Sequence, residues 1–237
     1  MLERMDYVRL APRRILDAGS GPPRRELRRR YPDAVTIALD FALAMLGRPG
    51  VFARLAGARE LRVCAELDRL PLAPGSIDLV WCNMALHWVS DPLPAFREFH
   101  RVLAPNGLVM FSTLGPDSLK ELRAAAGADR VHAFIDMHDL GDMLLAAGLS
   151  APVMDMELLT IEYADADQLL ADLRLSGQTS ARLDRPRGLA GRAFRDRLRR
   201  ALGDKPKATF EIVYGHAWRS PSAPPDVKTV RVFKSIS

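Results

Sequence analysis

The stretch Ile15–Gly21 reads ILDAGSG and decides the fold class. A short apolar run leads into Asp17, and Gly19 and Gly21 then follow one residue apart. Glycine adopts positive φ angles and has no Cβ, so this spacing suits the end of a first parallel strand where bare backbone approaches a nucleotide-like ligand. A helix is predicted just afterwards, with its free N–H groups facing the same place. The stretch therefore predicts an α/β protein that holds an adenosine-containing cofactor.

The next two predicted strands end in acidic residues that belong at the same edge of the sheet. Asp40 follows the apolar run Val35–Leu39 and is placed to accept the hydroxyls of a ribose, with Phe41 beside it. After the third strand, Glu66 is placed to accept a hydrogen bond from an adenine amino group, and Leu67 to pack on the ring. These side chains complete a predicted nucleoside site.

Length and composition indicate one ordinary globular domain. The chain has 237 residues, of which 48% are hydrophobic and 27% charged. No apolar run approaches the ~20 residues that span a bilayer, and the first residues lack the layout of a signal peptide. Cys64 and Cys82 lie in apolar runs, so we expect buried, reduced thiols and a cytoplasmic protein. The histidines and cysteines have no metal-site spacing.

The net charge of +5 comes from arginine in two blocks, Arg24–Arg30 and Arg182–Arg200. One interpretation is that both blocks are solvated helix faces. The other is a docking surface for an acidic macromolecule. Neither block is interleaved with aromatic residues, and no nucleic-acid-binding motif is present, so nucleic acid is the weaker acidic partner.

Strand-length apolar runs alternate with helical patterns in the first half, which predicts βαβ units and a parallel sheet. One helix is expected after Asp91, which caps it, with Pro92 in its first turn. Another is expected from Asp117, while Pro105–Gly107 turns the chain between elements. The predicted strands are Arg14–Asp17, Val35–Asp40, Leu61–Cys64, Ile77–Asn83 and Leu108–Thr113.

The second half predicts helices and one late strand. Asp139 is expected to cap a helix that ends at Gly148, and a capping box at Asp165 to open another. We expect a helical, lid-like insertion over about 165–207, with residues 178–207 mobile, and a flexible tail over about 220–237. The alternating run Ala208–Trp218 predicts an antiparallel strand.

Taken together, the segments resemble the class I methyltransferases that use S-adenosylmethionine. Arg24 interrupts the sixth position of the nicotinamide-binding pattern Gly-x-Gly-x-x-Gly, which weakens a dinucleotide interpretation. The resemblance implies a doubly wound, mostly parallel sheet of seven strands with the last strand antiparallel, within one domain over 1–237, and cofactor across the ends of the first strands. The matching segments are Leu16–Gly21, Ala38–Asp40, Leu70–Leu72, Ile77–Val80 and Arg101–Gly107.

A narrower resemblance covers nearly the whole chain. It is to the malonyl-acyl-carrier-protein O-methyltransferases of biotin synthesis, and it is carried by Asn83–Trp88, Phe111–Arg123, Ile135–Asp142, Ser176–Thr179 and Glu211–Trp218. The family methylates the free carboxylate of a malonyl thioester, which masks its charge for elongation by fatty-acid synthase. The resemblance implies S-adenosylmethionine as cofactor, and malonyl-acyl carrier protein or malonyl-CoA as acceptor.

The resemblance also assigns residues by position. Cofactor contacts fall on Asp17, Gly19, Gly21, Asp40, Phe41, Glu66, Leu67 and Asn83. Candidate substrate contacts are His87, Trp88, Arg123 and His138, and each has an ordinary structural interpretation as well. No catalytic base is expected, because a carboxylate is already ionised at neutral pH and the sulfonium is an activated electrophile. The arginines Arg182–Arg200 suit an acidic carrier protein.

The chain departs from the family pattern at three places. Family members carry helices ahead of the first strand, and Met1–Val8 resembles the end of one, so we expect either that the given start lies too late or that the gene is truncated. Pro23 stands where a glycine is usual, and the helix over Arg24–Arg30 has only Leu27 as an apolar anchor. A non-catalytic relative that binds a carrier or assembly partner, or a methyltransferase for another small carboxylic acid, therefore stays open.

Overall fold

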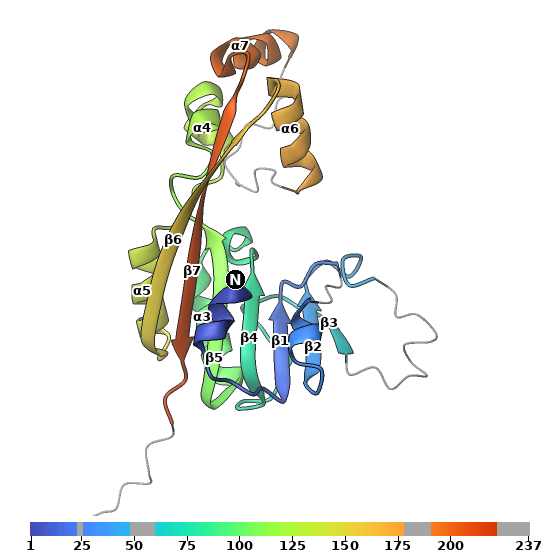
Figure 1. The fold of residues 1–237 in the computed structure, drawn as a ribbon, viewed down its shortest axis with the longest axis vertical. Helices are drawn as coiled ribbons and strands as arrows, with labels where there is room; N and C mark the ends of the chain where they lie inside the picture. The colour runs from blue at the N-terminus through green and yellow to red at the C-terminus, as the bar shows by residue number, and fades with distance from the viewer. Residues whose placement is uncertain (23–25, 48–59, 178–190, 222–237) are drawn as a thin grey trace, which may run out of the picture.

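The computed structural model describes residues 1–22, 26–47, 60–177 and 191–221. Within these residues lies a seven-stranded sheet of order β3-β2-β1-β4-β5-β7-β6 (Figure 1). Its strands are β1 (Arg14–Ala18), β2 (Val35–Asp40), β3 (Glu60–Cys64), β4 (Ile77–Asn83), β5 (Leu103–Leu114), β6 (Ser150–Glu162) and β7 (Lys207–Trp218). Strands β1 to β5 pair in parallel, whereas β7 pairs antiparallel with both β5 and β6. The predicted fold class and the antiparallel last strand are confirmed.

The early strands follow the prediction closely, and two strands differ from it. β5 begins at Leu103 because that residue already pairs with Ile77 before a register shift, and Asn106 takes a φ of 63° within the irregular stretch. β6 was not predicted. It is an edge strand whose side chains are mostly exposed, so its sequence carries no clear alternation between apolar and polar residues.

The helices are α1 (Glu26–Arg30), α3 (Pro92–Val102), α4 (Lys120–Ala126), α5 (Met137–Ala146), α6 (Ala166–Leu175) and α7 (Arg192–Leu202), with single 3₁₀ turns η1 (Glu3–Tyr7), η2 (Leu86–Trp88) and η3 (Ala128–Arg130). The predicted cap of α3 is confirmed, since Asp91 accepts the Leu93 N–H at 2.9 Å. The capping box of α6 is confirmed as well: Asp165 accepts the Gln168 N–H, and the Gln168 side chain accepts the Ala164 N–H.

Two predicted helix starts were wrong by about a turn. α5 is capped by Asp136, which accepts the His138 N–H, and Asp139 lies inside the helix. α4 begins three residues after Asp117, because Leu119 adopts a left-handed φ of 56° while its N–H bonds the carbonyl of Thr209. A polar residue near an apolar run can cap a helix at either of two positions, so the sequence pattern left the start ambiguous.

The sheet is covered on both faces by apolar side chains. On one face α3 and α5 pack against the strands around Phe96, Phe99 and Phe111, which are fully buried. On the other face η1 lies across β4 and β5, and Met5 is fully buried there against Trp81 (Figure 1). This core fixes the carboxyl ends of the parallel strands at one edge of the sheet.

A second, smaller apolar cluster lies beyond that edge. We call this region the cap: α4, η3, α6 and α7 with the adjoining ends of β6 and β7. The buried residues of the cluster are Leu119, Val131, Tyr163, Leu169, Leu173 and Ala208. The arrowheads of β1 and β4 point toward the end of the molecule at which α4, α6 and α7 lie (Figure 1). The helices α6 and α7 fall within the predicted insertion. Residues 178–190 and the predicted tail beyond residue 221 lie outside the described residues.

Two further expectations concerned the burial of the cysteines and the absence of a membrane-spanning segment. Both cysteines are free, but only Cys82 is buried; Cys64 is exposed at the end of β3, so the expectation of two buried thiols was wrong for it. Among the described helices, not one combines the length and apolar character needed to cross a bilayer.

Candidate cofactor and acceptor site

Gly19 leaves the end of β1 in a conformation that only glycine fits. Its φ is +70°, and its N–H bonds the Leu39 carbonyl at 2.8 Å. A Cβ built there would lie 2.3 Å from the Cβ of Ala85. Both the backbone angle and the lack of space exclude a side chain. The sequence predicted that this backbone approaches a ligand; the structure shows that Gly19 packs closely against Ala85, and its contact with a ligand stays a prediction.

Asp40 joins the loop after β1 to the end of β2. One carboxylate oxygen accepts the Gly21 N–H at 3.0 Å, and the other accepts the Ala42 N–H at 2.9 Å. Gly21 itself has a φ of +58°. The side chain is buried, but each carboxylate oxygen keeps a second lone pair. Asp40 can thus hold the loop in place and still accept hydrogen bonds from a diol.

Apolar side chains and a free carboxylate stand exposed beside Asp40. Phe41 is 74% exposed and Leu43 70%, which is unusual for large apolar residues. Glu66 is exposed just past the end of β3, which pairs with β2, and its side chain bonds no described residue. Leu67 is half-buried against the main core. An acceptor next to bare apolar surface fits a nucleoside: the carboxylates bond its polar edges and the rings cover the apolar side chains.

Asn83 ends β4 on the far side of β1. Its Oδ1 accepts the Ser112 hydroxyl at 2.8 Å, and that hydroxyl accepts the Met84 N–H at 3.1 Å. Met84 follows with a φ of 56°, a strained angle for a residue with a side chain. This arrangement fixes the Asn83 amide, whose NH₂ group bonds no described residue. Asp17 lies in β1 between Ala38 and Trp81 of the neighbouring strands.

His87 is the most unusual polar side chain of this edge. It lies in η2 at 7% exposure, and neither ring nitrogen has a hydrogen-bond partner among the described residues. Its ring contacts Trp88 at 5.1 Å and Phe134 at 6.3 Å between centroids. Burial, with His132 nearby, lowers the pKa of His87 to about 4. At neutral pH it is therefore an uncharged imidazole with one unused N–H donor in apolar surroundings.

Sequence reasoning missed the segment that covers His87. His132 and Phe134 lie between η3 and α5, with ring centroids 5.3 Å apart. These two residues belong to no pattern of spacing with His87. Only the fold brings them beside η2, so no local sequence signal pointed to this contact.

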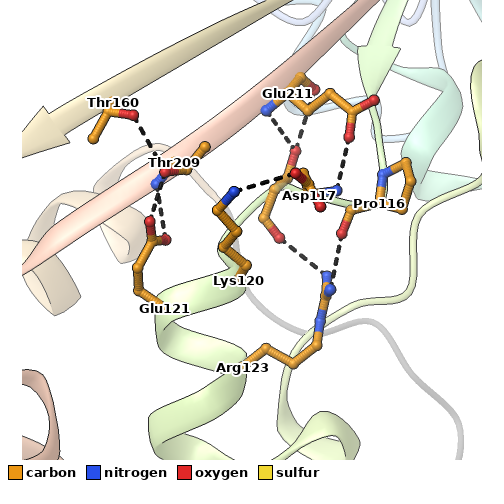
Figure 2. Close-up of polar contacts among 9 residues, drawn as sticks. Pro116, Asp117, Lys120, Glu121, Arg123, Thr160, Thr209 and Glu211 are labelled. Atoms are coloured by element: carbon orange, nitrogen blue, oxygen red, sulfur yellow. Dashed lines mark hydrogen bonds and ion pairs between the residues drawn. The ribbon is translucent and has the colours of Figure 1, made fainter.

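Arg123 and His138 have structural partners. Arg123 donates to the carbonyls of Pro116 and Ser118 at 2.8 and 3.0 Å, which holds the loop between β5 and α4 (Figure 2). The His138 ring bonds the Asp136 carboxylate at 2.7 Å, and its side chain is 80% exposed. These contacts explain both residues without a ligand. Their role toward a substrate stays a prediction.

Two glutamates that sequence reasoning gave no role fasten the cap to β7 (Figure 2). Glu211 is buried and accepts the Asp117 N–H at 2.7 Å. Glu121 accepts both the N–H and the hydroxyl of Thr209, at 3.0 and 2.6 Å. Glu211 stood within a motif of the resemblance, but a motif alone does not show that a carboxylate points back at a neighbouring loop.

Among the described residues, no group of three or more histidine, cysteine, aspartate or glutamate side chains is arranged to hold a metal ion. The polar groups at the strand ends are acceptors at Asp40 and Glu66 and neutral donors at Asn83 and His87. Such a set suits an uncharged sugar and base at one end and an anionic acceptor at the other.

The chain matches the methyltransferase domain family over residues 16–111. The malonyl-acyl-carrier-protein O-methyltransferase of Gallionella capsiferriformans is 47% identical over 235 residues, which cover 92% of this chain and 81% of the relative. The protein of the same name from a Methylovorus species is 48% identical over 236 residues, covering 92% and 79%.

Solved structures share the fold at low sequence identity. The YcgJ protein of Bacillus subtilis aligns with a TM-score of 0.65 at 18% identity, over 92% of this chain and 97% of that one. Phosphoethanolamine N-methyltransferase 2 of Haemonchus contortus, in complex with S-adenosyl-L-methionine, aligns with a TM-score of 0.56 at 16% identity, over 92% of this chain and 51% of that one.

Proposed function

The chain belongs to the malonyl-acyl-carrier-protein O-methyltransferase family, and on this premise we propose that it methylates the free carboxylate of a malonyl thioester carried by acyl carrier protein, with S-adenosylmethionine as donor. The observation that carries the proposal is the 47–48% identity to relatives of that name over 92% of the chain. The similarity therefore extends beyond the strand ends into the cap.

The cofactor residues fit the nucleoside part of this donor. Asp40 accepts from the ribose, Glu66 accepts from the adenine amino group, and Phe41 and Leu67 cover the ring. Gly19 keeps the backbone close at the end of β1. When bound, S-adenosylmethionine supplies a methyl group on a sulfonium, which needs no further activation.

Two further residues belong to the methionine part of the donor. Asp17 and Asn83 lie on the neighbouring strands β1 and β4 and serve its amino and carboxylate groups. A carboxylate suits an ammonium, and the unused NH₂ group of Asn83 suits an anion. Their opposite hydrogen-bonding character orients the donor along the edge of the sheet.

His87 holds the acceptor carboxylate. A malonyl carboxylate is ionised at neutral pH, so no base has to remove a proton. A cation held against it would stabilise the charge that methylation removes, and would slow the reaction. A neutral imidazole N–H orients the carboxylate without that penalty, while Trp88 and Phe134 exclude water from the reacting oxygen.

The chemistry of the methyl ester suggests what this reaction is for. The methyl ester removes the negative charge from the end of a malonyl group, so the thioester enters fatty-acid synthase as a primer. We place the chain on this basis in the cytoplasm, at the first step of pimeloyl synthesis for biotin. Rescue of biotin-free growth in a strain without its own malonyl methyltransferase tests this placement.

The reaction is tested with purified protein, S-adenosylmethionine and malonyl-acyl carrier protein. We expect mass spectrometry to show the gain of one methyl group on the malonyl thioester and none on an acetyl thioester, which lacks the free carboxylate. Calorimetric titration with S-adenosylhomocysteine should show binding at a single site. Binding of the nucleoside without methylation of any malonyl thioester would indicate that the chain is a non-catalytic relative. Methylation of other small acids in preference to malonyl thioesters would show that the acceptor is a different carboxylic acid.

The assignment of His87 is tested by removing its donor. His87→Phe keeps the ring contacts and loses the N–H, so the turnover number should fall by an order of magnitude or more while the affinity for S-adenosylhomocysteine stays unchanged. His138→Phe is the matched control. A loss that follows His138 instead would put the acceptor at the start of α5.

A further inference from the structure

Helix α7 is strongly basic along its whole length. Its sequence RAFRDRLRRAL holds five arginines against the single acid Asp196. The apolar residues Phe194, Leu198 and Leu202 recur at helical spacing, and Leu198 is buried. The arginines therefore flank the side of α7 that packs on the rest of the cap, and most of them face solvent.

One of these arginines has a structural role. Arg199 bonds both carboxylate oxygens of Asp167 on α6, the shorter contact being 2.6 Å. It is half-buried and joins α7 to α6. Arg192, Arg195, Arg197 and Arg200 are exposed, and no described carboxylate pairs with any of them.

The arginines that lack a carboxylate partner oppose the electrostatics of their own helix, although Arg200 donates to the Asp196 carbonyl and Arg197 lies over the Phe194 ring. Arg192 and Arg195 lie in the first turn, where the helix dipole disfavours cations, and no acid in that turn offsets them. Like charges three and four residues apart also repel one another. A helix built this way gains little by itself from its charges. An anionic surface laid against it would remove the repulsion.

The other arginine block is different. On α1, Arg28 pairs with Glu60 at 3.3 Å, and Arg30 pairs with Asp6 at 2.7 Å. Of the described arginines in that block, only Arg29 lacks a partner. The first block is therefore largely neutralised within the protein, whereas the charges of α7 remain available to a partner.

We propose that the exposed arginines of α7 form the docking surface for acyl carrier protein, an acidic protein whose helices carry clustered carboxylates. The inference rests on the proposed function and adds the place at which the carrier binds. The cap stands at the end of the molecule to which the strands of the cofactor edge point, so a carrier on α7 has its thioester on the correct side (Figure 1). Complementary charge there speeds encounter and sets orientation.

The test compares two charge reversals on opposite parts of the molecule. Arg192→Glu with Arg195→Glu changes α7, and the new acids suit the helix start, so the fold should be kept. Arg29→Glu on α1 is the control, with Arg195→Gln as a milder variant that only removes charge. Binding of fluorescently labelled acyl carrier protein is measured by anisotropy over a range of salt concentrations. Turnover is measured with malonyl-acyl carrier protein and with malonyl-pantetheine, which has no carrier.

The expected result is a loss of carrier affinity of about tenfold or more in the double variant, a smaller loss in Arg195→Gln, and none in Arg29→Glu. Salt should weaken carrier binding of the unchanged protein more steeply than that of the double variant. Turnover of malonyl-pantetheine should be unchanged in all variants. Equal carrier affinity in the double variant and the unchanged protein would overturn the inference, and so would an equal loss in Arg29→Glu. Failure of the proposed function looks different, because the unchanged protein would then methylate neither malonyl substrate.

Discussion

The sheet edge, to which we assign the donor, and the cap, to which we assign the carrier, are built by different physical means. At the edge, the residues proposed to meet the donor are fixed by backbone contacts: a glycine without space for a Cβ, and a carboxylate held by two N–H groups. In the cap, α7 packs against α4 and α6 with Leu198 buried, and arginines that lack a carboxylate partner are exposed along it. A small rigid molecule needs fixed geometry, whereas a protein partner tolerates mobile side chains and responds to charge. The two regions should therefore respond to mutation in separable ways.

The two regions meet at the loop between β5 and α4. Gly115 donates its N–H to the Glu211 carbonyl, and the Glu211 side chain accepts the Asp117 N–H (Figure 2). Ser118 adds two bonds to the Glu211 backbone. This junction couples the cap to β7, so it decides how independent the regions are.

The largest effect is expected at the edge. Asp40→Ala removes the acceptor for two backbone N–H groups and for the ribose, and charged hydrogen bonds are worth about 1.5–3 kcal/mol each. We expect the dissociation constant for S-adenosylhomocysteine to rise at least about a hundredfold, measured by calorimetry. Carrier binding, measured by anisotropy, should be unchanged. An unchanged nucleoside affinity would remove Asp40 from the site, and a parallel loss of carrier binding would show that the regions are not separable.

The next effect is expected at the junction. A Cβ at Gly115 would lie 2.4 Å from the carboxyl carbon of Glu211, whose side chain is buried. Gly115→Ala should lower the free energy of unfolding by about 2 kcal/mol, as overpacking usually does, measured by urea denaturation.

Gly141→Ala in α5 is the matched control for the junction. Its new Cβ would meet Met154 at 3.5 Å, an ordinary contact, and alanine favours helix, so this variant should be as stable as the unchanged protein or more stable. Equal stability of the two variants would show that the Glu211 side chain moves aside at little cost in free energy.

The third effect concerns the pH dependence of stability at the edge. His87 has a pKa lowered to about 4 by burial, whereas an exposed histidine in the unfolded chain titrates near 6.5. Between these values the unfolded chain takes up a proton that the folded protein does not. Stability should therefore fall as the pH falls from about 6.5 toward 4, by about 2 kcal/mol at pH 5.

His87→Phe isolates this contribution, because the other histidines are the same in both proteins. The variant should lose less stability than the unchanged protein over the same pH range in urea denaturation. Parallel curves would mean that His87 is hydrated or finds a partner in solution.

The smallest effect is expected inside the cap. The Tyr163 hydroxyl donates to Asp172 at 2.8 Å, and Asp172 is exposed, so water can replace the donor. Tyr163→Phe should cost about 1 kcal/mol of the free energy of unfolding and leave nucleoside affinity unchanged. Tyr7→Phe is the control, since Tyr7 is 90% exposed and should cost nothing measurable. A change in nucleoside affinity in Tyr163→Phe would contradict the separation of the regions.

The edge was predictable from the sequence because each strand end is marked by a few consecutive residues. Apolar runs that close in Asp17, Asp40 and Asn83 locate three strand ends, and parallel pairing brings such ends together. The glycine spacing after β1 adds the backbone constraint. The strand ends lie where the sequence predicted them, but their contacts were not predictable: both carboxylate oxygens of Asp40 already accept backbone N–H groups.

The contacts that depend on the whole fold were not predictable. Phe134 reaches His87 from a segment nearly fifty positions later, and Glu211 turns back onto the loop at Gly115. Asp136 rather than Asp139 caps α5, although both residue types suit the position. β6 carries no clear alternation because it is an edge strand with few buried contacts, Met154 and Ile161 among them. Except for the cap of α5, whose partner is the nearby His138 N–H, the deciding partner is distant in sequence or is solvent.

The pairing of β6 with β7 continues until Glu162 stands opposite Lys207. The chain from Tyr163 to Pro206 is therefore an excursion from a single hairpin, and it enters and leaves at neighbouring points. Its described residues meet the rest of the molecule at the apolar cluster that includes Leu119 and Leu122, and at Phe194, over whose ring Arg130 lies at 4.2 Å. Such an excursion can be replaced by another with a matching apolar face while the pairing of β6 with β7 stays the same, so this hairpin is a place at which the cap can be altered separately from the proposed donor site.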